Sequence, residues 1–438
     1  MHLWRPRDGS ISVSPDVALT AHYQRRTLSE HSSEHCSEMG VVVELQSART
    51  QWSAIMDALN AAADVVLDDP HITSELVKSE GVQYLTRFVG AANIFEMESD
   101  SAYPQLSRVF SPDNNWALPC PDGVYLTAPL DGAHNYRIWG TRGTSHMLVA
   151  EVFKGSFSDV PHMSVHDSRS DVQLGENGEV EFFLGQERLS DNWLTIPPGP
   201  SVFLLRQWFY DWDVEEQGQF FIERIGATYP PPPVTAEMLA ERLARYTHFL
   251  RSTSAAFVRS AAQHYCAPAD RIPFPQVMAE ISEEHENPDA YSMRGQVYGL
   301  GHYTCELDEA VILEVSPPEC PYWSFALFSQ YWERSDWLTR PTSINGHQAM
   351  LAEDGVFRAV ISHRDPGVPN WLDAGHRTIG LIGARYYGAA TVPEPTLRVV
   401  KLAELRAALP ASTPTVDAAT RKAELDRRQA ALRRRFQP

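Results

Sequence analysis

The stretch PYWSFALFSQYWERSDW, residues 321–337, begins with a run of strongly β-forming and mostly apolar residues, 322–328. Successive side chains of a strand point to opposite faces, so Phe325 and Leu327 share one face and Ala326 and Phe328 the other. Both faces are apolar, which predicts a strand buried between two layers. Glu333 and Arg334 follow where this strand is expected to end. They could be solvated charges at the end of the strand, or they could line the mouth of a pocket.

Similar short runs of β-forming residues surround this stretch and form two series. The first holds VYLTAPL, YRIWG, MLVAEVF, VEFFLG, SVFLLRQWFYDW and QFFIERIG, and the second holds GQVYGLGHYTCEL, AVILEV, TIGLIGARYYG and TLRVVKL. Asn177-Gly178 and Asp354-Gly355 lie between runs and supply the positive φ angles of hairpin turns. The spacing predicts a mainly β, α+β fold with two β-sandwich or jelly-roll-like units, residues 101–229 and 269–410.

Helical periodicity marks two segments outside these series. In residues 41–100 apolar side chains recur every three or four positions, and Asp68-Asp69-Pro70 interrupts them, which predicts a helical hairpin. Four prolines, 230–233, end the first β series. A linker helix is predicted over residues 230–268, with Thr235 as its N-cap.

The two ends of the sequence are polar. Residues 1–40 show neither period 2 nor period 3.6 and are expected to be a disordered tail, with Met39 as an alternative start. Residues 411–438 are expected to be a basic helical tail, because VDAATRKAELDRRQAALRRRF carries seven basic and three acidic side chains. This helix could be solvated or could bind the acidic surface of a second subunit, giving a homo-oligomer.

Composition narrows the classes of partner. The chain has 438 residues, 43% of them hydrophobic and 21% charged, which is typical of globular proteins. A formal charge of −19 argues against nucleic acid or an anionic membrane as the main partner and leaves a small-molecule ligand open. Five scattered cysteines and no apolar run of membrane-spanning length predict a cytoplasmic protein without a membrane segment.

No metal and no cofactor are expected from the motifs. The nearest metal candidates are His162, His166 and Asp167 in VPHMSVHDS and His31, His35 and Cys36 in the N-terminal tail. The four-residue spacing of the first two histidines suits a helix better than this loop-like context, and three ligands on a disordered tail favour adventitious binding. The glycine pairs in VYGLGHY and GTRG lack the spacing of a phosphate-binding loop. There is no GxSxG nucleophile motif.

The segment SHRDPGVPNWLDAGH, residues 362–376, holds several charged and titratable side chains close together in the sequence. Asp365-Pro366-Gly367 predicts a tight turn. Asp373 precedes His376 by three residues and could orient its imidazole as a general base. Arg364 could bind an anionic group. The alternative is a turn with a buried Trp371 and a few ion pairs, with no reactive role.

These residues resemble an uncharacterised bacterial family, the domain of unknown function numbered twelve-fourteen, over about residues 293–409. Its members share a YW…W motif, an SxN…Q stretch and a DPGxPNWLD..GH signature. The resemblance implies a β-sandwich in a bacterial protein and no established reaction. The signature falls on Tyr322, Trp323, Trp332, Ser343, Asn345, Asp365, Gly367, Asn370, Trp371, Asp373 and His376.

Three functions remain open at this point. The first is an acid–base enzyme acting on a small, partly apolar metabolite, of lyase, isomerase or hydrolase type. Its catalytic residues would be His376, Asp373, Asp365 and Arg364, and its substrate-binding residues Trp371, Asn370, Trp332, Arg334, Tyr322, Trp323, His363 and Asn345. The second is a non-catalytic, aromatic-rich module that binds a ligand such as a carbohydrate. The third is an oligomeric structural protein.

Overall fold

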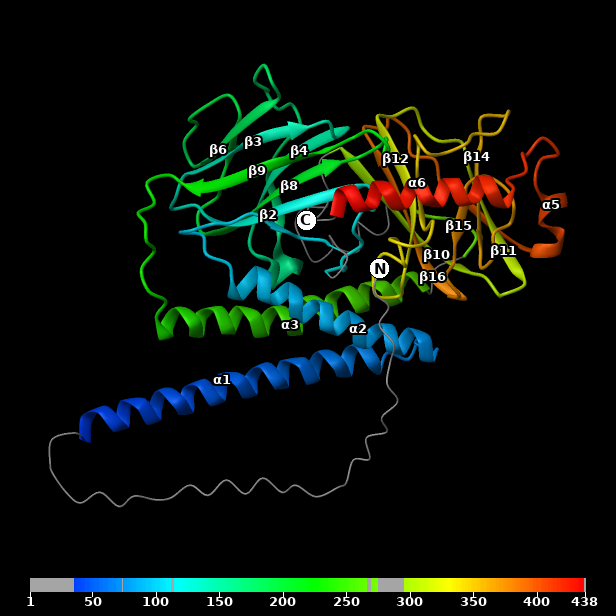
Figure 1. Ribbon diagram of the computed structural model, residues 1–438. Coiled ribbons are helices and arrows are strands. Elements are labelled where there is room, and N and C mark those ends of the chain that lie inside the picture. The colour runs from blue at the N-terminus through cyan, green and yellow to red at the C-terminus, as the bar shows by residue number, and fades with distance from the viewer. Residues whose placement is uncertain (1–34, 73, 112–113, 266–268, 275–294, 437–438) are drawn as a thin grey trace, which may run out of the picture. The chain divides into compact units, whose positions relative to one another are not determined.

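The computed structural model describes residues 35–72, 74–111, 114–265, 269–274 and 295–436 (Figure 1). The chain divides into a unit of residues 1–50, of which the start of one helix is described, and a unit of residues 51–438, to which the following description refers. The fold is α+β with two β-rich units, as the sequence predicted. The expected tail lies mostly outside the described residues, and the first helix begins at His35, within it.

The first β-rich unit consists of two sheets. One has the order β1-β2-β8-β4-β5, and the other has the order β7-β6-β3-β9. Their bounds are β1 Ser107–Arg108, β2 Gly123–Asp131, β3 Tyr136–Gly143, β4 Met147–Lys154, β5 Ser164–Arg169, β6 Glu179–Gly185, β7 Trp193–Thr195, β8 Pro200–Trp208 and β9 Gln217–Arg224. Ile138 and Phe182 from one sheet pack against Val152, Phe203 and Leu205 from the other, so the core of this unit lies between them.

The second β-rich unit repeats this plan. Its sheets have the orders β10-β16-β12-β13 and β15-β14-β11-β17, and every pair of neighbouring strands is antiparallel except β14 with β15. The bounds are β10 Gln296–Thr304, β11 Glu309–Val315, β12 Tyr322–Phe328, β13 Ser343–Asn345, β14 Phe357–Ser362, β15 Trp371–Asp373, β16 Ile379–Tyr387 and β17 Thr396–Lys401. Phe325, Leu327 and Ile382 pack against Leu313, Phe357 and Ile361 between the two sheets.

The strand predicted to be buried on both faces is confirmed. All seven residues of β12 are buried. Phe325 and Leu327 face the core between the sheets, whereas Ala326 and Phe328 form a separate cluster with Ala261 of a helix. Strand β8 behaves in the same way and is covered on its second face by helices.

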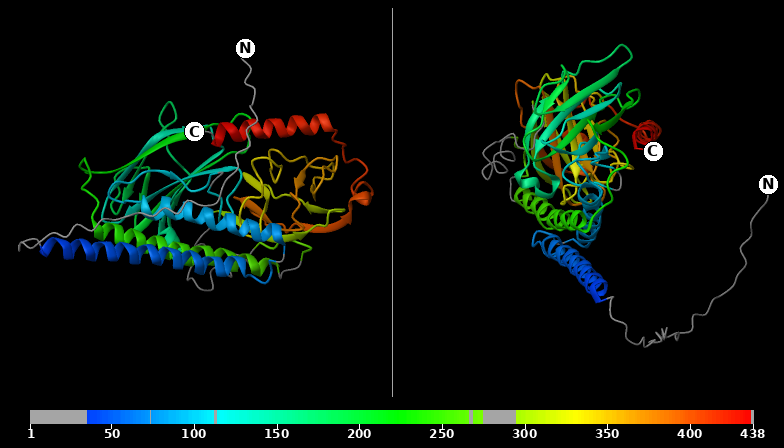
Figure 2. Two further views of the ribbon diagram at one scale, coloured as in Figure 1. Left: turned by 60° about the horizontal axis from the view of Figure 1, so that its bottom comes forward. Right: turned by 90° about the vertical axis from the view of Figure 1, so that its left-hand side faces the viewer.

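Helices cover the outer faces of the sheets that contain β8 and β12. Their bounds are α1 His35–Leu67, α2 Glu75–Ala92, the π-helical turn η1 Asn93–Met97, the 3-10 turn η2 Phe157–His162, α3 Ala236–Tyr265, the 3-10 turn η3 Leu402–Glu404, α5 Leu405–Ala408 and α6 Ala418–Phe436. Helices α2 and α3 lie side by side (Figures 1 and 2). The cap of α3 is confirmed, because the Met238 N–H donates to Thr235 Oγ1 at 3.3 Å. Helix α3 packs on both β-rich units, on Val202 of the first and Phe328 of the second.

Of the two hairpin turns predicted at glycines, one is confirmed and the other is not. The turn at Asp354-Gly355 is a hairpin, with Leu351 and Phe357 bridged across it. At Asn177-Gly178 the backbone turns as expected, and Gly178 has φ +77°. However, β6 after this turn pairs with β3 and β7, not with the preceding strand β5, which pairs with β4. The two runs flanking the turn belong to different sheets, so the prediction of strand pairing there was wrong.

Helix α6 is held by buried arginines together with two buried apolar residues. Its buried residues are Arg421, Ala431, Leu432 and Arg435. Arg421 and Arg435 lie fourteen residues apart with Arg428 midway, so all three share one face of the helix. This face contacts both β-rich units of the same chain, because Arg421 binds Asp365 and Arg435 binds the carbonyl of Pro121.

An ion pair joins helix α2 to the end of β12. Arg87 Nη1 lies 2.6 Å from Oε1 of Glu333, and both side chains are largely buried. Burial raises the pKa of Glu333 from its ordinary value of 4.5 to about 7, against the opposing effect of Arg87. Between these two values the folded chain binds more protons than the unfolded chain, so the free energy of unfolding falls as pH rises.

We expect Glu333→Gln to flatten this pH dependence, because glutamine stays neutral. The difference in unfolding free energy between wild type and variant should change by on the order of 1–3 kcal/mol between pH 5 and pH 8, measured by urea unfolding. Asp354→Asn is the control, since the pKa of Asp354 is about 2 and lies below this window. A variant that keeps the wild-type slope would contradict the assignment.

Candidate functional site

The segment 362–376 folds as a corner between two parallel strands, β14 and β15. The turn at Asp365 is formed as expected, because its Oδ1 accepts the N–H of Gly367 at 2.9 Å. Asn370 has φ +55° and binds backbone on both sides: its Nδ2 donates to the carbonyls of Met350 at 2.7 Å and Arg358 at 2.9 Å. These side chains satisfy local backbone groups and hold the corner rigid.

Helix α6 packs against an acidic and an aromatic side chain of this corner. Arg421 Nε lies 3.0 Å from Asp365 Oδ2, and Arg421 Nη2 donates to the carbonyl of Val368 at 2.6 Å. The guanidinium of Arg421 lies over the ring of Trp371, 5.4 Å from its centroid. Asp365 and Trp371 therefore contact another part of the same chain.

Asp373 and His376 have different partners. Asp373 is buried, its Oδ2 accepts from Arg340 Nη1 at 2.7 Å, and its Oδ1 accepts the N–H of Gly375 at 2.9 Å. His376 is exposed, has φ +67°, and stacks on His363 with 6.1 Å between ring centroids. The structure thus gives Asp373 an arginine partner where the sequence suggested the imidazole of His376.

The two neighbouring side chains of the corner also differ in their surroundings. His363 is buried, and its Nε2 lies 2.8 Å from the carbonyl oxygen of Cys305. Arg364 is exposed, and its carbonyl accepts the hydroxyl of Ser362 at 2.8 Å. Both cavities that we describe below lie in the first β-rich unit, whereas this corner belongs to the second.

Two other candidate residues, Tyr322 and Asn345, meet at a buried carboxylate that the sequence did not single out. Asp122 is 1% exposed and accepts from Tyr322 Oη at 2.5 Å, Asn345 Nδ2 at 2.9 Å and Trp212 Nε1 at 2.7 Å. The thiol of Cys120 lies 3.2 Å from the same Tyr322 hydroxyl. Burial raises the pKa of Tyr322 above its ordinary value, with the charge of Asp122 adding to the effect.

The remaining three candidates are also buried. Trp323 packs in the core of the second unit, 5.0 Å from the ring of Phe357. Trp332 has φ +61°, and its carbonyl accepts the N–H of Leu118 at 2.8 Å. Arg334 lies with its guanidinium 3.7 Å from the ring centroid of Trp337. The twelve candidates are therefore divided between the corner, the core and the Asp122 cluster, and do not share one cavity.

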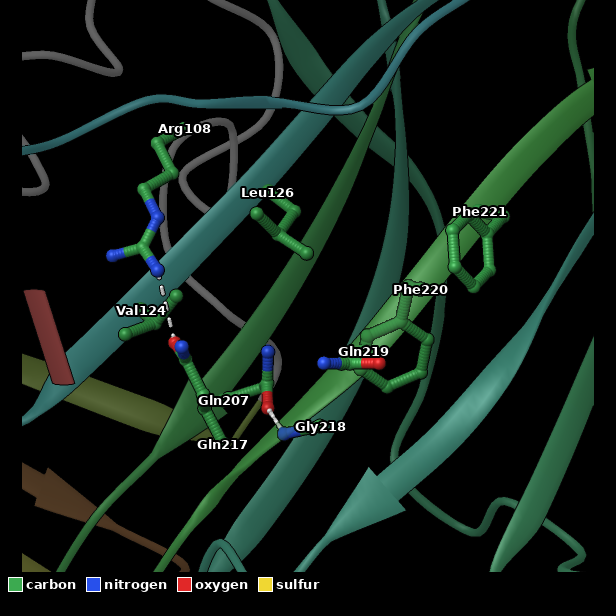
Figure 3. Close-up of a pocket in the computed structure, with 9 residues that line it drawn as sticks. All are labelled: Arg108, Val124, Leu126, Gln207, Gln217, Gly218, Gln219, Phe220 and Phe221. Carbon is green, nitrogen blue, oxygen red and sulfur yellow. Dashed lines mark hydrogen bonds between the residues drawn. The ribbon is translucent and has the colours of Figure 1, made fainter. Parts of the chain in front are cut away.

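A cavity of about 360 Å³ opens in the first β-rich unit beside the edge strand β9. Figure 3 shows Arg108 directed at Gln217, with the amide of Gln207 and the rings of Phe220 and Phe221 around the same hollow. Arg108 Nη2 donates to Gln217 Oε1 at 3.0 Å. Gln207 is fully buried and accepts the N–H of Gly218 at 2.6 Å, while its Nε2 has no hydrogen-bond partner within the described part of the chain.

A second, larger hollow of about 600 Å³ lies on the outer face of the sheet β7-β6-β3-β9. Arg137, Trp139, Glu181 and Phe183 line it, from alternate positions of β3 and β6. Trp139 stacks on Phe221 of β9 with 5.7 Å between centroids and 29° between planes. Since Phe221 lines the first hollow and Trp139 the second, the two hollows meet at this aromatic pair.

Charged groups border the aromatic pair. Arg137 lies over the ring of Trp139 at 4.9 Å, with Nε 2.5 Å from Glu181 and Nη1 3.4 Å from Glu223. Phe221 is 54% exposed, which is unusual for so large an apolar side chain. We define the outer aromatic face as Arg137, Trp139, Glu181, Phe183, Phe221 and Glu223. Sequence alternation in YRIWG could have revealed it, because Arg137 and Trp139 alternate with Tyr136 and Ile138.

Metal-binding groups do not gather in the described part of the chain. Among the described residues no three His, Cys, Asp or Glu side chains are placed to hold a metal ion. His162 instead lies 2.6 Å from Asp159, and Asp167 accepts from Thr195. Of the tail candidate, His31 lies outside the described residues, and His35 and Cys36 belong to the first turn of α1. None of the described helices is long and apolar enough to span a membrane.

Comparison with known proteins gives structural similarity without a function. No model of a known protein family matches the chain, and no curated protein matches it. An uncharacterised protein from Burkholderia cenocepacia has a similar crystal structure, with a TM-score of 0.77 and 27% sequence identity over 82% of this chain and 99% of that one. A protein from Vibrio parahaemolyticus aligns over 78% of this chain and 100% of that one, with 12% identity and a TM-score of 0.42. The resemblance to family twelve-fourteen stays a prediction.

The contacts of α6 predict that Arg421→Gln destabilises the protein. The substitution leaves Asp365 without its ion pair and removes the contact with Trp371. We expect a loss of about 1–3 kcal/mol in the free energy of unfolding, measured by urea denaturation. Lys422→Gln on the exposed side of the same helix is the matched control and should stay within about 0.5 kcal/mol of wild type. Equal effects of the two substitutions would contradict the docking role of Arg421.

Proposed function

We propose that this protein is a non-catalytic ligand-binding protein whose first β-rich unit binds a neutral carbohydrate on the outer aromatic face. The observation that carries the proposal is the stacked, partly exposed pair of Trp139 and Phe221 where two hollows meet. Flat aromatic faces pack against the C–H faces of sugar rings, and neighbouring polar groups bind the hydroxyls.

The polar groups around the pair match this ligand. The Glu181 and Glu223 carboxylates accept hydrogen bonds from hydroxyls, and the amides of Gln217 and Gln219 both donate and accept. Gln207 lines the smaller hollow, and its buried Nε2 is a donor for which the described residues supply no acceptor. A buried polar atom of this kind gains a hydrogen bond when a ligand hydroxyl or carbonyl binds.

Charge favours a neutral sugar over an acidic one. The chain carries a formal charge of −19, and the larger hollow is lined by Glu179, Glu181 and Asp191 against a single arginine, Arg137. A uronic acid or a phosphorylated sugar would be repelled by these carboxylates. Neutral hexose or pentose units are not penalised in this way.

The acid–base enzyme is the weaker hypothesis on these contacts. Its general base needs an oriented imidazole, and both carboxylate oxygens of Asp373 are engaged by Arg340 and the backbone of Gly375. Asp365 is bound by Arg421. Acid–base chemistry at His376 would therefore require these contacts to break.

Cellular context is a separate part of the proposal. We propose a cytoplasmic location because Cys120, Cys305 and Cys320 are free thiols in the described chain. A homo-oligomer through α6 would use its exposed side, which includes Lys422, since the opposite side contacts the two β-rich units.

Binding should depend on the aromatic pair. We expect wild-type protein to be retarded in native gels containing a soluble neutral polysaccharide such as β-glucan, galactomannan or xylan. Trp139→Ala and Phe221→Ala should each weaken binding at least tenfold, which is about 1.4 kcal/mol. Trp52→Ala is the control, because Trp52 is 59% exposed on α1 and lines neither of the two hollows.

Two results would count against the proposal. One is the absence of retardation by every neutral polysaccharide in a broad panel, and the other is retardation that survives both aromatic substitutions. His376→Ala should leave retardation unchanged, because His376 lies in the second β-rich unit. A loss of binding in His376→Ala would instead favour a site at the 362–376 corner.

A further inference from the structure

Four buried arginines lie in the interior where the two β-rich units meet. Arg206, Arg334, Arg385 and Arg435 are each 5% exposed or less. Arg206 of β8 comes from the first unit, Arg385 of β16 from the second, and Arg334 follows β12. The charges of Arg385 and Arg435 both act on Arg334, so these groups are close enough to repel one another.

Carboxylates compensate only part of this charge. Arg206 Nε lies 2.8 Å from Glu151 Oε2, and the charge of Asp122 acts on Arg435. Among the described residues no carboxylate forms an ion pair with Arg334 or Arg385, although one Nη of Arg385 donates to the carbonyl of Leu118. Buried charges in proteins are normally paired, so two such guanidinium groups require explanation.

The guanidinium of Arg334 is contacted on its face and at Nε. Its face packs on Trp337 at 3.7 Å, and its Nε lies 3.4 Å from Asn115 Oδ1. Nη1 and Nη2 are both buried, and neither has a hydrogen-bond partner among the residues that the structure describes. These two nitrogens form a fork that matches the two oxygens of a carboxylate. Burial lowers the pKa of Arg334 to about 9, as expected for a charge that lacks a partner.

Strained backbone surrounds the same place. Ala117, Leu118, Trp332 and Asp336 all have positive φ angles between +38° and +61°. Leu118 connects the two sides, because its N–H donates to the carbonyl of Trp332 and its own carbonyl accepts from Arg385. Unfavourable backbone conformations persist where surrounding contacts impose them, and they concentrate at binding sites.

We infer that Arg334 and Arg385 form a binding site for a small ligand that carries a carboxylate, enclosed between the two β-rich units and separate from the outer aromatic face. The open fork of Arg334 takes the two carboxylate oxygens, and Arg385 supplies the second positive charge. The side chains of Tyr125 and Cys120 lie near both arginines. Tyr298 is half-buried and lies 5.4 Å from the Arg385 guanidinium, so this side of the site approaches the surface.

The test measures carboxylate binding to the full-length protein. Acetate and succinate are titrated into wild type by isothermal titration calorimetry in a cationic buffer at pH 7, with chloride and inorganic phosphate as comparison anions. We expect saturable binding of a carboxylate and a rise in melting temperature that follows its concentration. Arg334→Gln should weaken binding at least tenfold. Arg188→Gln, at an exposed arginine of the first unit, should leave it unchanged.

Further variants keep the inference falsifiable if Arg334→Gln does not fold. Arg334→Lys retains the positive charge but loses the two-pronged guanidinium. It should weaken carboxylate binding severalfold, whereas its response to chloride should equal that of wild type. Trp139→Ala should bind carboxylate as wild type does, which separates this site from the carbohydrate proposal. The inference is overturned by the absence of carboxylate binding, by tighter binding of phosphate, by an equal response to chloride (an adventitious ion only), or by full binding in Arg334→Lys.

Discussion

The carboxylate of Asp122 connects the two β-rich units and is the contact on which their arrangement depends. Among the described residues three O–H and N–H groups donate to it: those of Tyr322 and Asn345 come from β12 and β13 of the second unit, and that of Trp212 comes from the first. The Cys120 thiol of the first unit is a weaker donor at 3.8 Å. An ionised carboxylate is costly to bury unless donors surround it. Only the observed docking of the units supplies all three donors, so the buried charge specifies that docking more strictly than apolar contacts do.

Burial of apolar side chains also constrains how the two β-rich units are arranged. Strands β8 and β12 are buried on both faces, which is possible only if each has a partner sheet on one side and a helix on the other. Helix α3 serves both strands, since its residues pack on the first unit through Phe249 and on the second through Ala261. Helix α6 contacts both units through arginines, whose guanidinium groups lie over aromatic rings and donate to backbone carbonyls.

The sequence predicted the fold class and the order of the elements because these follow from local periodicity. The two-sided strand at 322–328, the hairpin at 354–355 and the cap at Thr235 are all local patterns. Strand pairing is not local. The turn at Asn177-Gly178 has the right residues, yet the strand after it joins a different sheet from the strand before it. Nothing in a turn specifies which of several β runs completes a sheet.

The site was harder to predict, for a related reason. The many polar residues in 362–376 led to the prediction of a catalytic site there. The number of polar residues in a segment does not reveal which residues distant in the sequence bind to them. Arg340 and Arg421 neutralise the two aspartates of that segment from 33 and 56 residues away. Trp139 and Phe221 become neighbours only when β3 pairs with β9. Asp122, in a plain CPDG turn, gave no local signal at all.

Charge distribution gives a common reason for both proposed sites. The chain has an excess of acidic groups overall, whereas the interior near Arg334 holds guanidinium groups that exceed the carboxylates around them. Surface acids screened by solvent and salt do little for a charge enclosed in protein, since the Debye length at physiological ionic strength is about 8 Å. Compensation must therefore come from a group that sits against the fork itself. The outer face, with its carboxylates exposed to water, needs no such counter-ion and favours an uncharged ligand, so one chain offers two chemically distinct binding environments.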